Sequence, residues 1–262
     1  MVLKPIEINI NDYPLEFHSL LKDARIYDSS CSPEARVIFI DGGGGFFLKQ
    51  GKKGSLEREA LMTRYFHSKG ISGEVMEYIS GNEDWLLTRK IPGKDGISKE
   101  YLDQPERLCD VFAQELRKLH EIDFQGCPIP NHTERYIASA KEGYLKGKFN
   151  QEGLPSIWSF KEGKEAFGVI EKESHLLETN TLLHGDYCLP NIILSDWKLS
   201  GFIDLDWGGV GDRHVDLYWG SWTLNYNLKT DRYRERFMDA YGRDKIELDK
   251  LRIMAAAEAL TD

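Results

Sequence analysis

A short stretch of the chain concentrates the polar residues that could carry out chemistry. His184, Gly185 and Asp186 follow two leucines, Asn191 comes five residues after the aspartate, and Asp204 comes thirteen residues after the asparagine. Each polar group stands beside a short apolar run, and a strand end holds a side chain firmly, as a catalytic carboxylate requires. The spacing indicates one site assembled from the ends of several short strands.

Phosphoryl transfer from a nucleotide is a chemistry that such residues can support. It requires a carboxylate that accepts or orients the acceptor hydroxyl, and oxygen ligands for the Mg²⁺ that bridges the phosphates. Asp186 fits the first role, and Asn191 and Asp204 fit the second. An aspartate at a strand end is by itself more often a cap or a turn former, so the prediction depends on the three residues together.

The same chemistry requires a lysine that neutralises phosphate charge and a carboxylate that positions this lysine. Lys49 lies on a predicted strand, and Glu59 lies ten residues later, within the next predicted helix. Alone, Lys49 would be interpreted as a solvated strand residue, and Glu59 as part of the charged face of a helix. Their placement on consecutive elements favours a lysine–glutamate pair.

The first group of elements that must position these residues is rich in strands. Residues 35–41 and 45–49 are apolar runs with β-branched and aromatic residues, and they predict a hairpin. The glycine run between them is interpreted as the hairpin turn, because no Lys-Ser or Lys-Thr follows it as in a phosphate loop. Helical spacing predicts a helix between residues 55 and 70, followed by a second pair of strands at 74–79 and 85–90.

The rest of the chain is predominantly helical. An apolar stripe from Leu108 to Leu119 predicts an amphipathic helix, and a strand-rich interruption from Leu182 to Ile203 carries the polar residues described above. Further helices are predicted near residues 131–146, 162–178, 214–227, 230–241 and 246–260. The pattern indicates a small sheet-rich lobe over residues 1–91, a larger helical lobe over residues 92–262, and a cleft where they join.

Composition and charge indicate where the protein acts and which class of ligand it can bind. The chain has 262 residues, of which 41% are hydrophobic and 29% charged, as in globular proteins. It has no apolar run long enough to cross a membrane and no signal peptide, so we expect a cytoplasmic protein without a membrane partner. The formal net charge of −9 argues against nucleic acid as a partner and favours a cationic ligand.

The motifs resemble those of a known family. LLHGDYCLPNIIL followed by SGFIDLDWGGVGDRHVDL is similar to the aminoglycoside phosphotransferases, most closely to the aminoglycoside 3′-phosphotransferases, which are relatives of the eukaryotic protein kinases. The resemblance extends from the FFLK strand to the last helix. It implies an α+β, bilobal, protein-kinase-like fold with a small antiparallel-sheet N-lobe and a larger, mainly helical C-lobe.

The resemblance also implies roles for single residues. Asp186 matches the catalytic aspartate, Asn191 and Asp204 match the magnesium ligands, and Lys49 with Glu59 matches the pair that holds the α- and β-phosphates. His184 and Asp216 match structural positions around the catalytic loop, although a proton-shuttling role for His184 stays open.

The resemblance also implies which residues contact the nucleotide base and the phosphates. Phe47 matches an aromatic residue that stacks on adenine, with plain core packing as the alternative. The segment Leu87 to Ile91 matches the hinge, so main-chain groups of Arg89 and Ile91 are expected to bind the base. Ser32 lies in a stretch similar to the loop that covers the phosphates.

The activity implied is Mg²⁺-dependent transfer of the γ-phosphoryl group of ATP or GTP to a hydroxyl of an aminoglycoside, an antibiotic-resistance activity. The alternatives are a kinase of another small cationic or sugar metabolite, and a nucleotide-binding module without turnover. A protein kinase is disfavoured because nothing between Asp204 and Asp216 resembles an activation segment.

The acceptor site departs from the family pattern. Glu258 falls at the family's C-terminal acidic pair, but Ala257 replaces the expected aspartate, and Leu205, Asp206 and Trp207 replace a Gly-Arg pair. The region 145–166, where the family carries acids over the substrate, here has more lysines than glutamates. Glu258, Asp206 and Trp207 remain the predicted acceptor contacts.

Two further points about the acceptor stay open. Trp219 or Trp222 stands where the family often has an arginine; either could stack on a ligand, although a tryptophan is more often packed core. Asp231 and Glu235 are additional candidates for holding amines.

Overall fold

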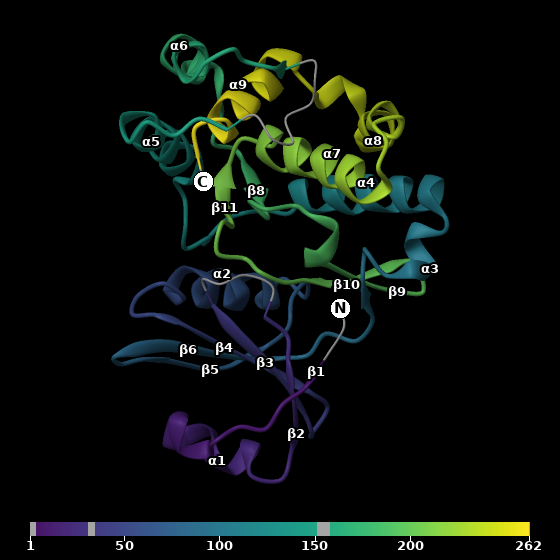
Figure 1. The fold of residues 1–262 in the computed structure, drawn as a ribbon. Coiled ribbons are helices and arrows are strands. Elements are labelled where there is room, and N and C mark those ends of the chain that lie inside the picture. The colour runs from purple at the N-terminus through teal and green to yellow at the C-terminus, as the bar shows by residue number, and fades with distance from the viewer. Residues whose placement is uncertain (1–3, 31–34, 151–157, 262) are drawn as a thin grey trace.

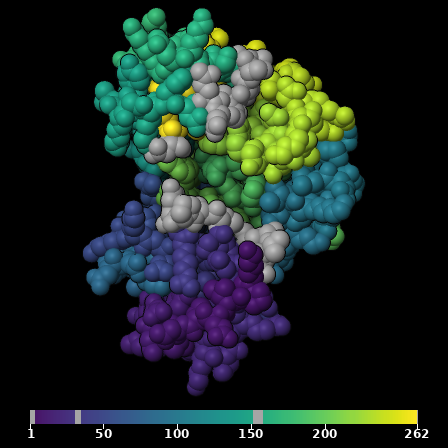
Figure 2. All heavy atoms as spheres, viewed as in Figure 1, coloured from purple at the N-terminus to yellow at the C-terminus, as the bar shows by residue number. Residues whose placement is uncertain are grey.

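The structure is a computed structural model that describes residues 4–30, 35–150 and 158–261. The chain folds into a sheet-rich N-terminal part and a larger helical part, which lie one above the other in Figure 1 and in the space-filling view of Figure 2. The α+β fold implied by the sequence is therefore confirmed. The boundary at residue 91 stays a prediction.

The N-terminal part is built on one antiparallel sheet. Its six strands have the order β1-β2-β3-β4-β6-β5. They are β1 (Lys4–Pro5), β2 (Arg25–Asp28), β3 (Arg36–Asp41), β4 (Phe46–Lys52), β5 (Val75–Ser80) and β6 (Glu83–Arg89). Both predicted hairpins, β3–β4 and β5–β6, are present. Gly43, Gly44 and Gly45 have positive φ values of 59°, 98° and 88°, which explains the glycine run as a turn.

The two faces of the sheet carry different side chains because residues alternate along a strand. Phe46 and Leu48 of β4 point into a core with Phe17 of helix α1 (Leu15–Leu21). Phe47 and Lys49, one residue out of phase, point to the opposite face. Helix α2 (Glu57–Ser68) covers that face, where Ala60 packs against Leu86.

The helical part holds the larger core. Its helices are α3 (Lys99–Leu102), α4 (Pro105–His120), α5 (His132–Leu145), α6 (Gly163–Glu173), α7 (His214–Leu228), α8 (Arg234–Tyr241) and α9 (Leu248–Glu258). Leu108, Phe112, Leu116 and Leu119 of α4 are buried, so the apolar stripe in the sequence marks the face that packs. Among the described residues, no helix combines the length and the apolar content that crossing a membrane requires.

Five short strands and a 3₁₀ turn surround the polar segment of the helical part. They are β7 (Lys94–Asp95), β8 (Thr181–Leu183), β9 (Ile192–Ser195), β10 (Lys198–Phe202) and β11 (Gly209–Gly211), with η4 (Leu189–Asn191) between β8 and β9. They pair as β10-β9-β7 and as β11-β8. Asp196 and Trp197, with φ values of 49° and 63°, form the two-residue turn between β9 and β10.

Candidate active site

Gly185 shapes the loop that leaves β8. Its φ is +85°, and a Cβ built on it would lie 1.9 Å from the main-chain oxygen of Trp207. Only glycine fits a left-handed conformation this close to another backbone. The loop is thereby pressed against the segment that follows Asp204, which brings the two halves of the polar motif together.

Asp186 and Asn191 form the centre of the site. The Asn191 Nδ2 donates to the Asp186 Oδ2 at 2.9 Å and to the Asp186 main-chain oxygen at 3.1 Å. Because the Asn191 Nδ2 donates to the aspartate, the Asn191 Oδ1 can serve as an oxygen ligand for a metal ion. Asp186 lines a cavity, so its carboxylate is accessible to a ligand.

His184 ties the catalytic loop to the strand before Asp204. Its Nδ1 accepts from the Asp186 main-chain N–H at 3.3 Å, so its Nε2 carries the proton and donates to the Ile203 main-chain oxygen at 3.1 Å. Its side chain is buried. Both ring nitrogens are used by backbone groups, which favours the structural role over proton shuttling.

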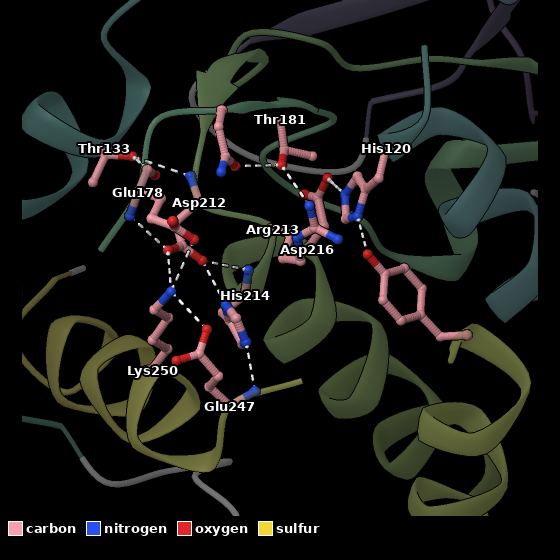
Figure 3. A network of polar contacts seen from close by, with 12 residues as sticks. His120, Thr133, Glu178, Thr181, Asp212, Arg213, His214, Asp216, Glu247 and Lys250 are labelled. Atoms are coloured by element: carbon pink, nitrogen blue, oxygen red, sulfur yellow. Dashed lines mark hydrogen bonds and ion pairs between the residues drawn. The ribbon is translucent and has the colours of Figure 1, made fainter. Parts of the chain in front are cut away.

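Asp216, on the first turn of α7, fixes the loop that carries Asp186 through hydrogen bonds to its backbone. It accepts the main-chain N–H groups of His184 and Gly185, both at 2.8 Å, and the Nε2–H of His120 at 3.1 Å. Figure 3 shows His120 beside Asp216. On the other side of the imidazole ring, the hydroxyl of Tyr241 lies 2.8 Å from the His120 Nδ1. The loop is therefore held by a fully buried chain of hydrogen bonds.

The charge states in this chain follow from burial and hydrogen bonding. Burial lowers the pKa of His120, so the ring is neutral and donates from one nitrogen only. Burial opposes ionisation of Asp216 as well, but the hydrogen bond from His120 and the backbone N–H groups outweigh it. The pKa of Asp216 therefore lies below its ordinary value.

Lys49 links the sheet to the helical part. Its Nζ lies 2.7 Å from the Glu59 Oε2 and 3.0 Å from the Asp204 Oδ1. Burial opposes the charge on Lys49, but these two carboxylates raise its pKa above the ordinary value. Burial raises the pKa of Glu59 to about 7, although Lys49 partly offsets it. The short Nζ–Oε2 distance favours an ionised pair at neutral pH.

Asn191 and Asp204 are suited to a magnesium ion. The Ile203 main-chain N–H donates to the Asn191 main-chain oxygen at 3.0 Å, so the asparagine lies beside the residue that precedes Asp204. Asp204 has a φ of +60°, rare for a non-glycine residue, and its side chain is half-exposed. No cluster of three or more His, Cys, Asp or Glu in the described part of the chain could hold a metal. Mg²⁺ fits, because it needs only one or two protein oxygens besides phosphates and water.

The predicted nucleotide contacts are distributed around β4 and β6. Phe47 is partly exposed on the same face as Lys49 and contacts Phe39, with ring centroids 5.0 Å apart. The main-chain N–H groups of Arg89 and Lys90 donate to other backbone oxygens, whereas that of Ile91 has no such partner within the described residues. Ser32 lies outside the described residues.

A cavity of about 780 Å³ opens beside Asp186. Two of the predicted acceptor contacts, Glu258 and Trp207, line it. Asp206 does not: it forms an ion pair with Arg58 of α2, at 3.0 Å between the Nη2 and the Oδ2. Sequence spacing could not identify this partner, which lies 148 residues away.

The other predicted acidic contacts also lie outside this cavity. Asp231 is paired with Arg234 and Glu235 with Arg243. Of the lysine-rich region 145–166, Lys146 and Lys148 line the cavity, and residues 151–157 lie outside the described part.

Sequence reasoning missed the wall contributed by α5, with Tyr136 and Glu142, and did not decide on Trp219 and Trp222, which line the cavity. Tyr136 donates to the Glu258 Oε1. Trp219 and Trp222 are three residues apart in a predicted helix, and this spacing could have indicated that both lie on the same helical face.

Comparisons with known proteins agree with this geometry. The sequence profile of the family described as "Phosphotransferase enzyme family" matches residues 28–254. A probable aminoglycoside 3′-phosphotransferase of Lactococcus lactis is 49% identical over 259 residues, covering 98% of each chain. An aminoglycoside 3′-phosphotransferase of Escherichia coli is 30% identical over 240 residues, covering 87% of this chain and 83% of the relative.

Solved structures share the fold. An aminoglycoside-3′-phosphotransferase of type VIII superposes with a TM-score of 0.69 at 19% identity, covering 98% of this chain and 93% of the other. An aminoglycoside phosphotransferase of Streptomyces rimosus, solved with ADP and streptomycin, gives 0.68 at 22% identity, covering 87% and 90%.

Proposed function

The chain belongs to the phosphotransferase enzyme family, close to its aminoglycoside 3′-phosphotransferases, and we propose that it transfers the γ-phosphoryl group of ATP or GTP to a hydroxyl of an aminoglycoside. The observation that carries the proposal is the contact between lobes in which Lys49 meets both Glu59 and Asp204, beside a cavity that contains Asp186. This contact supports the proposal, because it brings the residues proposed to bind the phosphates close to the residue proposed to act on the acceptor.

Positioning and charge neutralisation dominate this chemistry. Asp186 receives or orients the proton of the acceptor hydroxyl, whose oxygen forms the new bond to phosphorus as the bond to the β-phosphate oxygen breaks. Lys49 neutralises charge on the phosphates. A Mg²⁺ ion held by Asn191 and Asp204 would stabilise the negative charge of the same phosphates.

Groups on β4 and just after β6 support a position for the nucleotide base beside the sheet. The free main-chain N–H of Ile91 and the main-chain oxygen of Arg89 provide one donor and one acceptor, and Phe47 provides an aromatic face near them on the adjacent strand.

The experiment is a transfer assay with ATP and with GTP, in the presence and absence of Mg²⁺, using kanamycin and neomycin as acceptors. We expect a product heavier by one phosphoryl group, formed only with Mg²⁺. Asp186→Ala should lower kcat by about 10²- to 10⁴-fold and change nucleotide affinity far less, because it removes a group used in the transition state.

The matched control is Asp196→Asn, which alters an exposed aspartate in the β9–β10 turn and tolerates the left-handed backbone there. It should retain normal turnover. Near-normal turnover in Asp186→Ala would remove Asp186 from its role. If the wild-type protein binds nucleotide but phosphorylates no aminoglycoside, the second candidate function becomes the better one: a kinase of another small cationic or sugar metabolite, which the aromatic lining of the cavity favours.

A further inference from the structure

Two consecutive charged residues of helix α2 reach the segment that follows β10. Glu59 holds Lys49, whose Nζ also lies 3.0 Å from the Asp204 Oδ1. Arg58 contacts Asp206 through two atoms of its guanidinium group: the Nη2 lies 3.0 Å from the Oδ2, and the Nε lies 3.3 Å from the Oδ1. Positions 204 and 206 are thus both tied to α2, which lies on the side of the sheet that faces the helical part (Figure 1).

The two links differ in what the proposed reaction requires of them. Asp204 would exchange Lys49 for a metal ion, so that contact does not hold the segment throughout the reaction. The Arg58–Asp206 pair contains no group that takes part in the proposed chemistry, and Asp206 does not line the cavity beside Asp186. This pair is therefore free to stay closed while Asp204 changes its partner.

The surroundings of Asp206 give its carboxylate a second task. Two N–H···O bonds between an arginine and a carboxylate fix their orientation as well as their distance. The Trp207 ring centroid lies 6.0 Å from the Arg58 Cζ and 5.7 Å from the Cζ of Arg135, which belongs to α5. Burial lowers the pKa of Arg135, nearby Arg58 lowers it further, and Asp206 partly offsets both effects. The carboxylate thus reduces the repulsion between two guanidinium groups from different lobes.

Packing and backbone conformation show that the same segment needs support. A Cβ built on Gly208 would lie 3.0 Å from the Cε of Met62, a buried residue one turn further along α2 than Arg58. Asp204 has a φ of +60°, a conformation that a residue other than glycine keeps only where its surroundings hold it. The segment 204–208 is therefore held against α2 by a lysine bridge, an arginine–carboxylate pair and an apolar contact.

We propose that Arg58 and Asp206 are a positioning pair for the reaction, which fixes the segment 204–207 on α2 so that Asp204 is presented to the metal-bound phosphates beside Lys49. This inference rests on the proposed function and gives Asp206 a role other than acceptor binding. Loss of the pair should weaken the metal-dependent part of nucleotide binding. The part that depends on the base and on Lys49 should persist, because those groups belong to the sheet.

The test compares Arg58→Gln, Asp206→Asn and the double variant in calorimetric titrations with a non-hydrolysable ATP analogue, with and without Mg²⁺. With Mg²⁺ we expect the Kd to rise about 5- to 20-fold in each single variant, and the double variant to resemble Asp206→Asn, because the pair is already lost there. Without Mg²⁺ the Kd should change less than about twofold. Arg58→Lys keeps the charge but not the two-atom contact, so it should recover only part of the affinity.

The matched control is Arg236→Gln. Arg236 of α8 contacts Asp110 of α4 through the same two atoms, at 2.7 and 2.6 Å, and its side chain is 45% exposed, as is that of Arg58. Both Arg→Gln variants should lower the midpoint of thermal unfolding by similar amounts. Only Arg58→Gln should change the nucleotide Kd and turnover, which separates positioning from general stability.

Three results would overturn the positioning pair. They are an unchanged Kd with Mg²⁺ in both single variants, additive losses in the double variant, and an equal rise of the Kd with and without Mg²⁺. Failure of the wild type to phosphorylate any aminoglycoside would count against the proposed function alone, because the titration requires no acceptor. A wild-type protein that binds no nucleotide would refute the proposed function, and the inference with it.

Discussion

At the scale of single residues, the carboxylates of the site differ in how much of each side chain is exposed to solvent. Asp216 is fully buried and holds main-chain N–H groups, whereas the side chain of Asp204 is half-exposed, and in the proposed reaction it would exchange its contact with Lys49 for a metal ion. The proposed reaction thus uses the accessible carboxylates, and the buried Asp216 fixes the loop that carries Asp186.

Glu258 provides a pH-dependent test at this scale. Burial raises its pKa from 4.5 to about 7, although the hydrogen bonds from Tyr136 and Thr261 partly offset this effect. A carboxyl group with a higher pKa in the fold binds its proton more tightly when folded, so its contribution to stability falls as the pH rises from about 4.5 to 7. Glu258→Gln cannot ionise and should escape this loss.

Thermal and urea unfolding at pH 5 and pH 8 measure the effect. Between these two pH values, we expect the free energy of unfolding of Glu258→Gln to improve relative to wild type by about 1–2 kcal/mol, less than full burial would give because the group also lines the cavity. Glu142→Gln is the control: the carboxylate is exposed and paired with Lys146, so its difference from wild type should not change over this range. A constant difference for Glu258→Gln would show that its pKa is not raised.

The motif residues were the most predictable part of the site. Asp186 contacts Asn191, and Lys49 contacts both Glu59 and Asp204. The sequence could predict these contacts because Asp186, Asn191 and Asp204 stand beside short apolar runs, while Lys49 and Glu59 lie on consecutive elements. Asp206 was not predictable, since its contact depends on Arg58, which a helix from the other lobe supplies. The sequence suggested that the Asp206 carboxylate could bind an acceptor, whereas in the structure it forms an ion pair with Arg58.

At the scale of elements, the loop between β8 and η4 depends on close backbone packing. Gly185→Ala would force a left-handed alanine into overlap with the main chain of Trp207. We expect a loss of about 2–4 kcal/mol in the free energy of unfolding, together with a severe loss of turnover, because the loop must move and carries Asp186 with it.

Gly126→Ala is the matched control for this substitution. Gly126 has a φ of +79°, close to that of Gly185, but its added Cβ meets nothing within 4 Å. It isolates the cost of the backbone conformation, about 1 kcal/mol. Equal losses in the two variants would show that the contact with Trp207 can relax.

The elements themselves could be predicted where the hydrophobic period was clear. The β3–β4 hairpin and helix α4 lie where the apolar runs and the 3.6-residue stripe place them, and the later helices differ from their predicted ranges mainly at the ends. The function of α7 was harder to predict. Its apolar residues face both the core and the cavity, so the sequence pattern alone does not separate a tryptophan that packs in the core from one that lines the cavity.

At the scale of the whole molecule, the two lobes share one helix. Leu56 and Ala60, at the start of α2, pack against the sheet, whereas Met62 and Phe66, further along the same helix, belong to the core of the helical part. A parallel bridge between Ser72 and Phe202 adds a backbone connection just after α2. Relative motion of the lobes must therefore be accommodated around α2.

This sharing predicts one cooperative unfolding transition. Two independent lobes would melt separately, but here the loss of either core removes buried contacts from α2 and weakens the other. In differential scanning calorimetry we expect a single peak whose calorimetric and van't Hoff enthalpies agree. Two resolved peaks would show that the lobes unfold independently.

The same helix limits how the chain can be divided. A fragment ending near residue 91 would expose Met62 and Phe66 to water, and the complementary fragment would lack the side chains that fill its core. Neither piece is a self-sufficient module that could be transplanted into another protein. A cut near residue 91 is compatible with activity only if the two pieces reassemble, as in a complementation reporter, with α2 supplying the surface by which one piece recognises the other.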